Sequence, residues 1–195
     1  MQKRRIALDV DGVMVDFLPG FEKAFEKVLG RPAIRVRNAW ALEDAYNATS
    51  EEIEAVWQGI ADMHIYRELA PLPGAIDALH LLQEEGYELH AVTAIQHRFE
   101  ADRRENLRAL GFRSSFIHPV GDLPKTPVLR QIQPLWFADD QVKHLHAAPF
   151  VPHRVWIHST DEQFPEEAGE HTHEARSLLE FVEHWLDDEH HRLKV

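Results

Sequence analysis

The chain has 195 residues, of which 44% are hydrophobic, so it can bury the core of one full domain plus a modest insertion, which argues against a fibrous or disordered chain. Its formal net charge of -12 argues against DNA or RNA as a partner, because binding to those polymers usually relies on clustered Lys and Arg. It has no cysteine, which excludes disulfide bonds and thiol catalysis and limits any zinc site to His, Asp or Glu ligands.

The N-terminal residues 1–5 are Met-Gln-Lys-Arg-Arg and lead directly into an apolar run, which leaves no room for a signal peptide. No stretch reaches the roughly 20 apolar residues that span a bilayer. We therefore expect a soluble cytoplasmic protein with no membrane partner.

Residues 6–13 read Ile-Ala-Leu-Asp-Val-Asp-Gly-Val, an apolar run that ends in two carboxylates and a glycine. This pattern is typical of a strand buried in a parallel sheet. Side chains alternate along a strand, so Asp9 and Asp11 are predicted to project to one side, while Gly12 lets the backbone turn close to a ligand. A calcium loop is a poor alternative, because its glycine stands sixth and Gly12 stands fourth from Asp9. An ordinary strand-to-loop junction remains an alternative.

A long segment separates this first strand from the next apolar run, which begins at Leu89. The spacing exceeds what one crossover helix needs, so we expect an insertion. One amphipathic helix is predicted around Phe21, Phe25, Val28 and Leu29, and a capping box at residues 49–52 opens a second, with a stripe of Ile53, Val56, Trp57 and Ile60. Pro19-Gly20 and the Pro-Leu-Pro-Gly sequence of 71–74 suggest hinges. The predicted division is a helical cap over residues 17–73 and a core of residues 1–16 and 74–195.

Apolar runs and helical patterns alternate through the rest of the chain. Further strands are predicted at 89–92, 116–120, 135–138 and 155–157, and helices at 75–85 and 98–110, where Gly86 and Gly111 follow as stop signals. A loop is expected at 164–169, and a final amphipathic helix carries Leu178, Phe181, Val182, Trp185 and Leu186. The pattern predicts a Rossmann-like three-layer α/β/α fold with a parallel sheet, and a small helical cap inserted after the first strand.

Four polar residues follow predicted strands or precede a helix. Thr93 ends the run at 89–92, Lys125 precedes a short helix, and Asp139 and Asp140 follow the run at 135–138. Each has an ordinary alternative: a strand-end threonine, a solvated lysine, and an aspartate that caps the helix expected at Val142 and Leu145. Two acids buried together need a cation, and an all-oxygen ligand set favours Mg²⁺.

The 14 histidines invite a second metal hypothesis. Close pairs stand at His144 and His146, His171 and His173, and His190 and His191. Their spacing matches no zinc signature, so we interpret them as structural or solvated residues.

In this order the motifs Asp9-Val10-Asp11-Gly12-Val13, Thr93, Lys125 and Asp139-Asp140 resemble those of the haloacid dehalogenase superfamily. The stretch 9–17, Gly20-Phe21, the sequence 71–75 and Lys125-Thr126 look more closely like the 5′(3′)-deoxyribonucleotidase branch. That branch usually has Thr-Ser where this chain has Thr93-Ala94, which puts the nucleotide preference in doubt.

The resemblance implies a set of roles. Asp9 is the expected nucleophile that forms an aspartyl-phosphate, and Asp11 the acid and then base. Thr93 and Lys125 are expected to bind the phosphoryl oxygens, with Gly12, Ala94 and Phe17 as further substrate contacts. Mg²⁺ is expected on the Asp9 carboxylate, the Asp11 main-chain carbonyl and Asp139, supported by Asp140.

The expected function is therefore a magnesium-dependent phosphatase for small phosphomonoesters, with nucleoside monophosphates favoured. Aromatic residues in or beside the insertion offer surfaces for a base: Phe17, Trp40, Tyr46, Trp57 and Tyr66. Weaker substrate candidates are Gln96, His97 and Arg98. The alternatives are a sugar-phosphate phosphatase, a phosphomutase and a non-catalytic interaction protein on the same fold. The sequence does not indicate an oligomeric state.

Overall fold

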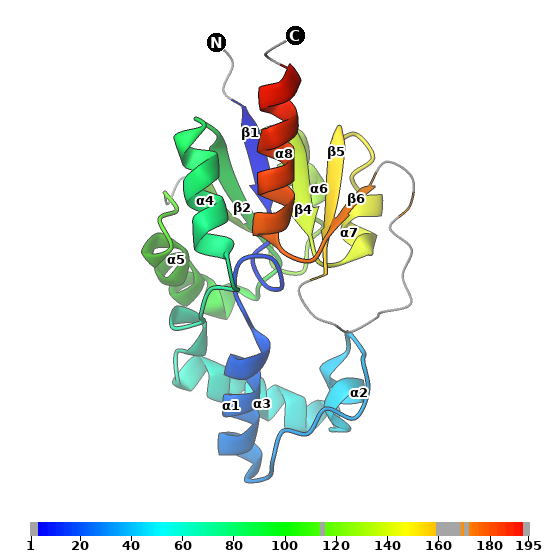
Figure 1. Ribbon diagram of the computed structural model, residues 1–195. Coiled ribbons are helices and arrows are strands. Elements are labelled where there is room, and N and C mark those ends of the chain that lie inside the picture. Colours follow the sequence, from blue (N-terminus) through cyan, green and yellow to red (C-terminus); the bar gives the residue numbers. More distant parts are fainter. Residues whose placement is uncertain (1–3, 114–115, 159–168, 170–171, 193–195) are drawn as a thin grey trace.

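The computed structural model describes residues 4–113, 116–158, 169 and 172–192, and its centre is a six-stranded parallel sheet (Figure 1). The order is β3-β2-β1-β4-β5-β6. The strands are β1 (Arg5–Leu8), β2 (Glu88–Thr93), β3 (Ile117–Pro119), β4 (Trp136–Asp139), β5 (His153–Ile157) and β6 (Thr172–Ala175). This order confirms the predicted parallel α/β fold. The strand order reverses at β1, and ligands of such sheets bind beyond the carboxyl ends of the strands at this point.

Helices cover both faces of the sheet. On one face α4 (Ala75–Glu84) and α8 (Leu178–Arg192) pack against a core that contains Ile6 and Leu8 of β1. On the other face α6 (Thr126–Ile132) and α7 (Val142–His146) pack against Ala7. Successive side chains of β1 thus enter opposite layers, as expected for a strand buried on both sides.

The insertion after β1 is helical, as predicted. It contains α1 (Leu18–Leu29), α2 (Leu42–Tyr46), α3 (Ser50–Asp62) and the 3-10 turn η1 (Ile65–Arg67). The helices lie together beyond the carboxyl ends of β1 and β2 (Figure 1). The predicted capping box begins α3: Thr49 Oγ1 accepts the Glu52 N–H at 3.2 Å, and Glu52 Oε2 accepts the Thr49 N–H at 2.9 Å.

The two chain segments that join the insertion to the sheet run beside each other. The Asp16 N–H donates to the Ala70 carbonyl at 2.9 Å, and the Leu72 N–H donates to the Met14 carbonyl at the same distance. Val15 and Pro71 form an isolated bridge between them. The entry and exit of the insertion are therefore tied together by backbone hydrogen bonds.

The structure differs from the sequence predictions in three elements. Strand β6 is not among the predicted strands, because Thr-His-Glu-Ala has no apolar pattern and only Ala175 of this edge strand is buried. Helix α2 has five residues and no side-chain cap, so its sequence contains no pattern that predicts a helix. The helix predicted at 98–110 starts as the 3-10 turn η2 (His97–Phe99) before α5 (Glu100–Ala109).

Most of the loop predicted at 164–169 lies outside the described residues, which there include only Gly169, and His171 also lies outside them. Within the described part of the chain, no helix is long and apolar enough to cross a membrane.

Candidate active site

Asp9 and Asp139 lie side by side because β1 and β4 are parallel neighbours. The ladder pairs Leu8 with Ala138, and the Asp9 N–H extends it by donating to the Ala138 carbonyl at 2.8 Å. Both aspartates are buried, Asp139 completely. The sheet therefore holds two carboxylates at the carboxyl ends of its central strands.

Lys125 lies between these carboxylates. It is the N-cap residue of α6 and is buried, and its Nζ lies 2.8 Å from Asp9 Oδ1 and 2.7 Å from Asp139 Oδ2. Its charge offsets part of the cost of burying two like charges. The alternative of a solvated surface lysine is wrong for this position.

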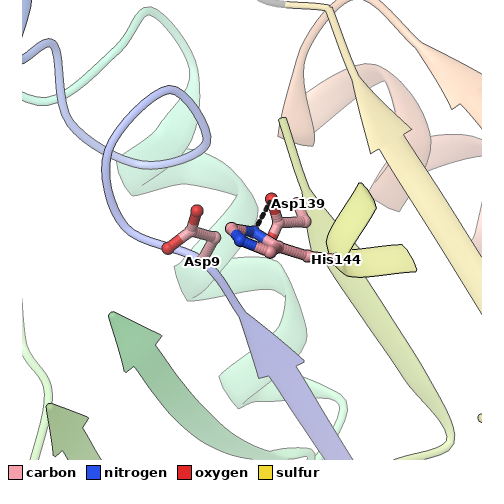
Figure 2. Close-up of side chains that lie close together, drawn as sticks. All are labelled: Asp9, Asp139 and His144. Carbon is pink, nitrogen blue, oxygen red and sulfur yellow. Dashed lines mark hydrogen bonds and ion pairs between the residues drawn. The ribbon is translucent and has the colours of Figure 1, made fainter. Parts of the chain in front are cut away.

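Asp139 has two more partners at the start of α7. Its Oδ1 accepts the Gln141 N–H at 2.9 Å, and His144 Nδ1 lies 3.0 Å from both of its oxygens. Figure 2 shows Asp9, Asp139 and His144 converging from β1, β4 and α7. The N-cap residue of α7 is Gln141, so the alternative in which Asp139 or Asp140 takes that position is wrong.

The pKa values follow from burial and these charges. Burial raises the pKa of Asp9 to about 6, with the negative charges of Asp139 and Asp11 adding to the rise and Lys125 opposing it. Burial acts in the same direction on Asp139, but Lys125 and His144 outweigh it and lower the pKa of Asp139. Burial alone would lower the pKa of Lys125, yet the two carboxylates raise it. Lys125 is therefore charged, and Asp139 is its ionised partner.

Asp140 contacts the turn that follows β1. Its Oδ1 is buried without a hydrogen-bond partner among the described residues, and burial, together with Asp9 and Asp139, raises its pKa well above the usual range. Gly12 has φ +77°, and a Cβ there would stand 2.3 Å from Asp140 Oδ2. Gly12 is thus required both by its conformation and by the close approach of Asp140.

Asp11 lies in the turn, past the last residue of β1, and not on the strand as predicted. It forms an ion pair with Arg103 of α5, whose guanidinium is fully buried and lies 4.6 Å from the centre of the Tyr66 ring. Nε and Nη1 of Arg103 have no hydrogen-bond partner among the described residues. Asp11 and Arg103 therefore form a second charged group beside the Asp9 cluster, and a buried guanidinium with unused donors is suited to an anionic ligand.

Thr93 ends β2 next to β1, where Ala91 is paired with Leu8. It is fully buried, and its Oγ1 finds no partner in the described part of the chain. Ala94 and His97 are exposed, and Arg98 forms an ion pair with Glu54 of α3 at 3.0 Å. Thr93 thus offers an unused hydroxyl at the sheet edge, whereas Arg98 links the core to the insertion.

The aromatic residues of the insertion form a packed cluster. The Phe17 ring is stacked at 5.7 Å on both Trp57 and Tyr66, and Tyr66 lies 4.9 Å from Phe99. Phe17 and Trp57 are partly exposed, whereas Tyr66 is buried. Tyr46 is a core residue that packs on Phe21 and Phe25, and Trp40 is 40% exposed. Phe17 and Trp57 are the rings best suited to meet a ligand.

The acidic cluster is suited to a metal ion. Ligand atoms of Asp9, Asp139 and His144 all lie within 4.8 Å of one another. His144 and Arg103 are not among the predicted site residues: His144 is one of a histidine pair interpreted as structural or solvated, and Arg103 is one of several arginines in a helix. The only signal for His144 was its place one turn after Asp139-Asp140.

Comparisons with known proteins agree with this geometry. A family model described as "5′ nucleotidase, deoxy (Pyrimidine), cytosolic type C protein" matches residues 3–119, more than half of the chain. A Bacillus cereus protein named "Putative nucleotidase" is 23% identical over 163 residues, which cover 80% of this chain and 86% of that protein.

Two solved structures show the same fold. A haloacid dehalogenase-like family hydrolase from Streptococcus pneumoniae aligns with a TM-score of 0.64 and 18% identity, covering 94% of this chain and 98% of the other. A hydrolase from Pseudomonas syringae aligns with a TM-score of 0.62 and 19% identity, covering 95% and 99%.

Proposed function

The chain belongs to the family of 5′ nucleotidase, deoxy (pyrimidine), cytosolic type C proteins and is a hydrolase of the haloacid dehalogenase superfamily, and from this premise we propose that it removes phosphate from nucleoside monophosphates. The observation that carries the proposal is the buried Asp9–Lys125–Asp139 cluster at the carboxyl ends of β1 and β4. A charged cluster at this edge costs stability unless a ligand uses it.

Asp9 is the proposed nucleophile. An oxygen of its carboxylate attacks phosphorus, the bond from phosphorus to the ester oxygen breaks, and an aspartyl-phosphate forms. Its contact with Lys125 supports this role, because the ammonium favours the ionised form of Asp9 against the effect of burial. The attacking oxygen of Asp9 and the departing ester oxygen lie in line on opposite sides of phosphorus.

Asp11 is the proposed acid and base. It donates a proton to the departing alkoxide, then takes one from the water that attacks phosphorus and releases inorganic phosphate. Its place in the turn, less buried than Asp9, suits a group that exchanges protons with substrate and water. Arg103 holds this carboxylate and is proposed as its positioning residue.

Lys125 and Thr93 are the proposed phosphate ligands. The Lys125 ammonium lies beside the nucleophile, and the unpartnered Thr93 hydroxyl can donate a hydrogen bond to a phosphoryl oxygen. Donors that are fixed before the substrate arrives stabilise the charge of the transition state. Gly12 keeps the turn close to Asp140 and leaves room for a phosphate above the backbone.

The residues present also fit Mg²⁺. Three carboxyl groups, those of Asp9, Asp139 and Asp140, face one ammonium, and Asp140 Oδ1 is a buried oxygen without a partner among the described residues. Both oxygens of Asp139 already have partners. We therefore assign the carboxylate ligands to Asp9 and Asp140, with the Asp11 carbonyl, in place of the Asp139 ligand that the resemblance implies and that the spacing of Asp9, Asp139 and His144 would also allow. Asp139 is assigned to holding Lys125. A bound Mg²⁺ would neutralise charge on the phosphoryl oxygens.

The substrate is proposed to be a nucleotide because of the aromatic cluster. Partly exposed Phe17 and Trp57 stack on each other, and Phe17 also stacks on Tyr66. The Tyr66 ring lies against Arg103, the ion-pair partner of Asp11. Stacking on such rings accepts any base. A sugar-phosphate phosphatase is the second candidate, favoured by Ala94, which lacks the second hydroxyl expected of deoxyribonucleotidases.

The test is phosphate release with Mg²⁺ from deoxyribonucleotides, ribonucleotides, sugar phosphates and an aryl phosphate. The Asp9→Asn variant should lose at least about 10³-fold in rate, whereas Asp122→Asn, at an exposed position, should not change it. Selective nucleotide turnover supports the proposal. Turnover of sugar or aryl phosphates alone would remove the nucleotide assignment, and transfer of phosphate to a sugar hydroxyl would indicate a mutase. No turnover of any ester would contradict a phosphatase.

A further inference from the structure

Trp156 of β5 makes a hydrogen bond to the segment that carries the acidic cluster. Its indole N–H donates to the main-chain carbonyl of Asp140 at 2.9 Å. Strand pairing sets this contact, because Asp139, the last residue of β4, pairs with Trp156 in the parallel ladder. Asp140 follows directly and therefore lies within reach of the indole.

Packing holds the indole ring of Trp156 in place. The side chain is buried in the apolar cluster that contains Val142 and Leu145 of α7. The His158 ring also packs against it, with 3.4 Å between the ring centroids. An indole has one N–H donor and no acceptor, so the Asp140 carbonyl uses the whole hydrogen-bonding capacity of this side chain. The direction of the bond is thus fixed before any ligand binds.

The carboxyl group of Asp140 occupies an unfavourable position unless a cation is present. Its Oδ1 is buried without a partner among the described residues, and a Cβ on Gly12 would stand 2.3 Å from its Oδ2. Burial and the negative charges of Asp9 and Asp139 raise its pKa. Repulsion between these carboxylates favours withdrawal of Asp140, and the bond from Trp156 opposes movement of the backbone that carries it.

Asp139, one residue earlier, is held through its side chain instead. Its Oδ2 accepts a hydrogen bond from Lys125 Nζ at 2.7 Å, and its Oδ1 accepts the Gln141 N–H at 2.9 Å. Asp140 Oδ1 has no bond of this kind within the described residues, and the main chain of Asp140 carries the contact to Trp156. The two adjacent acids are therefore fixed in different ways, and only Asp140 keeps a buried oxygen for a ligand.

From these contacts we infer that Trp156 is a positioning residue for the divalent-metal site: its N–H fixes the Asp140 main chain so that Oδ1 of that residue is presented to Mg²⁺ beside Asp9. The inference rests on the metal site of the proposed function and adds a residue that acts through Asp140 without touching the metal. Loss of such an outer contact typically weakens metal binding by about 10–100-fold. Trp156 therefore contributes to metal affinity.

Trp136 of β4 provides a matched control. It is buried like Trp156 and lies on the neighbouring strand, but it packs edge-on against Phe181 of α8, with 5.0 Å between the ring centroids. Its Nε1 has no hydrogen-bond partner in the described part of the chain. Replacement of either tryptophan by Phe removes the same atoms, but only at Trp156 does it remove a hydrogen bond.

The experiment measures Mn²⁺ binding to the full chain without substrate, by electron paramagnetic resonance of the free ion, with Mg²⁺ as the competitor. The wild-type chain should bind one Mn²⁺ that Mg²⁺ displaces, and Asp140→Asn should weaken that binding. Trp156→Phe should weaken it at least about tenfold, whereas Trp136→Phe should keep the wild-type affinity. Circular dichroism checks that each variant is folded.

Unchanged Mn²⁺ affinity in Trp156→Phe would overturn the inference. Equal weakening in Trp136→Phe would also overturn it, because the effect would then come from packing, and retained binding in Asp140→Asn would remove the ligand that Trp156 positions. The indole N–H resonances of the wild-type chain need no variant: Mg²⁺ should shift that of Trp156 and leave that of Trp136 unchanged, and an unshifted Trp156 resonance contradicts the inference. Metal binding in the expected order without turnover of any ester would support the inference and contradict the phosphatase.

Discussion

The carboxyl edge of the sheet and the helical insertion face each other, but they are built from different interactions. At the sheet edge, Asp9, Lys125 and Asp139 are buried and paired at 2.7–2.8 Å. In the insertion, the Phe17 ring stacks on Trp57 and on Tyr66. Substitutions are poorly tolerated in ion pairs whose geometry is set by the backbone, whereas one packed aromatic ring can be replaced by another. Under the proposed function, the strands therefore set the chemistry and the insertion sets the choice of substrate.

The largest effect is expected from removing the ammonium at the sheet edge. Lys125→Met leaves Asp9 and Asp139 without their shared cation, so phosphatase activity should fall at least about 10²-fold and stability by about 3–5 kcal/mol. Mg²⁺ should restore part of the stability in urea denaturation. Lys143→Met, at an exposed position of α7, is the control. A fully stable Lys125→Met variant would show that the cluster is not held by charge.

The next effect concerns Arg103, which connects the two regions through Asp11 and the Tyr66 ring. Arg103→Met should lower kcat on the order of 10²-fold, because Asp11 is no longer held in position. Arg104→Met, one residue later and partly exposed, should leave kcat unchanged. A changed KM with an unaltered kcat would reduce Arg103 to a substrate contact.

A smaller and more selective effect is expected in the insertion. Trp57→Ala removes the ring stacked on Phe17. KM for nucleotides should then rise by roughly 10-fold, which corresponds to the free energy of about one base-stacking contact. KM for glycerol phosphate, which has no ring, should stay the same. Trp40→Ala is the control within the insertion. An equal rise for both substrates would show that the ring supports the fold and not the base.

The smallest effect tests the insertion without touching the site. Thr49→Ala removes the capping box of α3 and should cost about 1 kcal/mol of stability in urea denaturation, with little change in kcat. Ser50→Ala, the neighbouring residue, should cost less. A large loss of activity in Thr49→Ala would mean that α3 positions the chemistry as well as the substrate.

Sequence patterns predicted most of the fold because buried strands and amphipathic helices carry periodic apolar residues. Five strands, the capping box of α3 and the final helix follow from those periods. Strand β6 could not be found this way, since it is a polar edge strand that pairs with β5 alone in the described structure.

The candidate site divides in the same manner. Asp9, Thr93, Lys125 and Asp139 stand at element ends, where the order of the superfamily motifs marks them, and the parallel sheet brings their strands together. Arg103 and His144 lie within helices, and their importance depends on which residue each faces across the fold. No local pattern of one sequence contains that information.

The two segments that join the insertion to the sheet, residues 14–16 and 70–72, affect how the sequence of the insertion can vary. Because these segments are hydrogen-bonded to each other, the residues between them form a loop whose ends already meet. Lengthening such a loop costs little closure entropy. The order of strands does not depend on what lies between them. Under the proposed function, the insertion can therefore be exchanged, and its replacement is expected to change the substrate while Asp9, Lys125 and Asp139 keep their places.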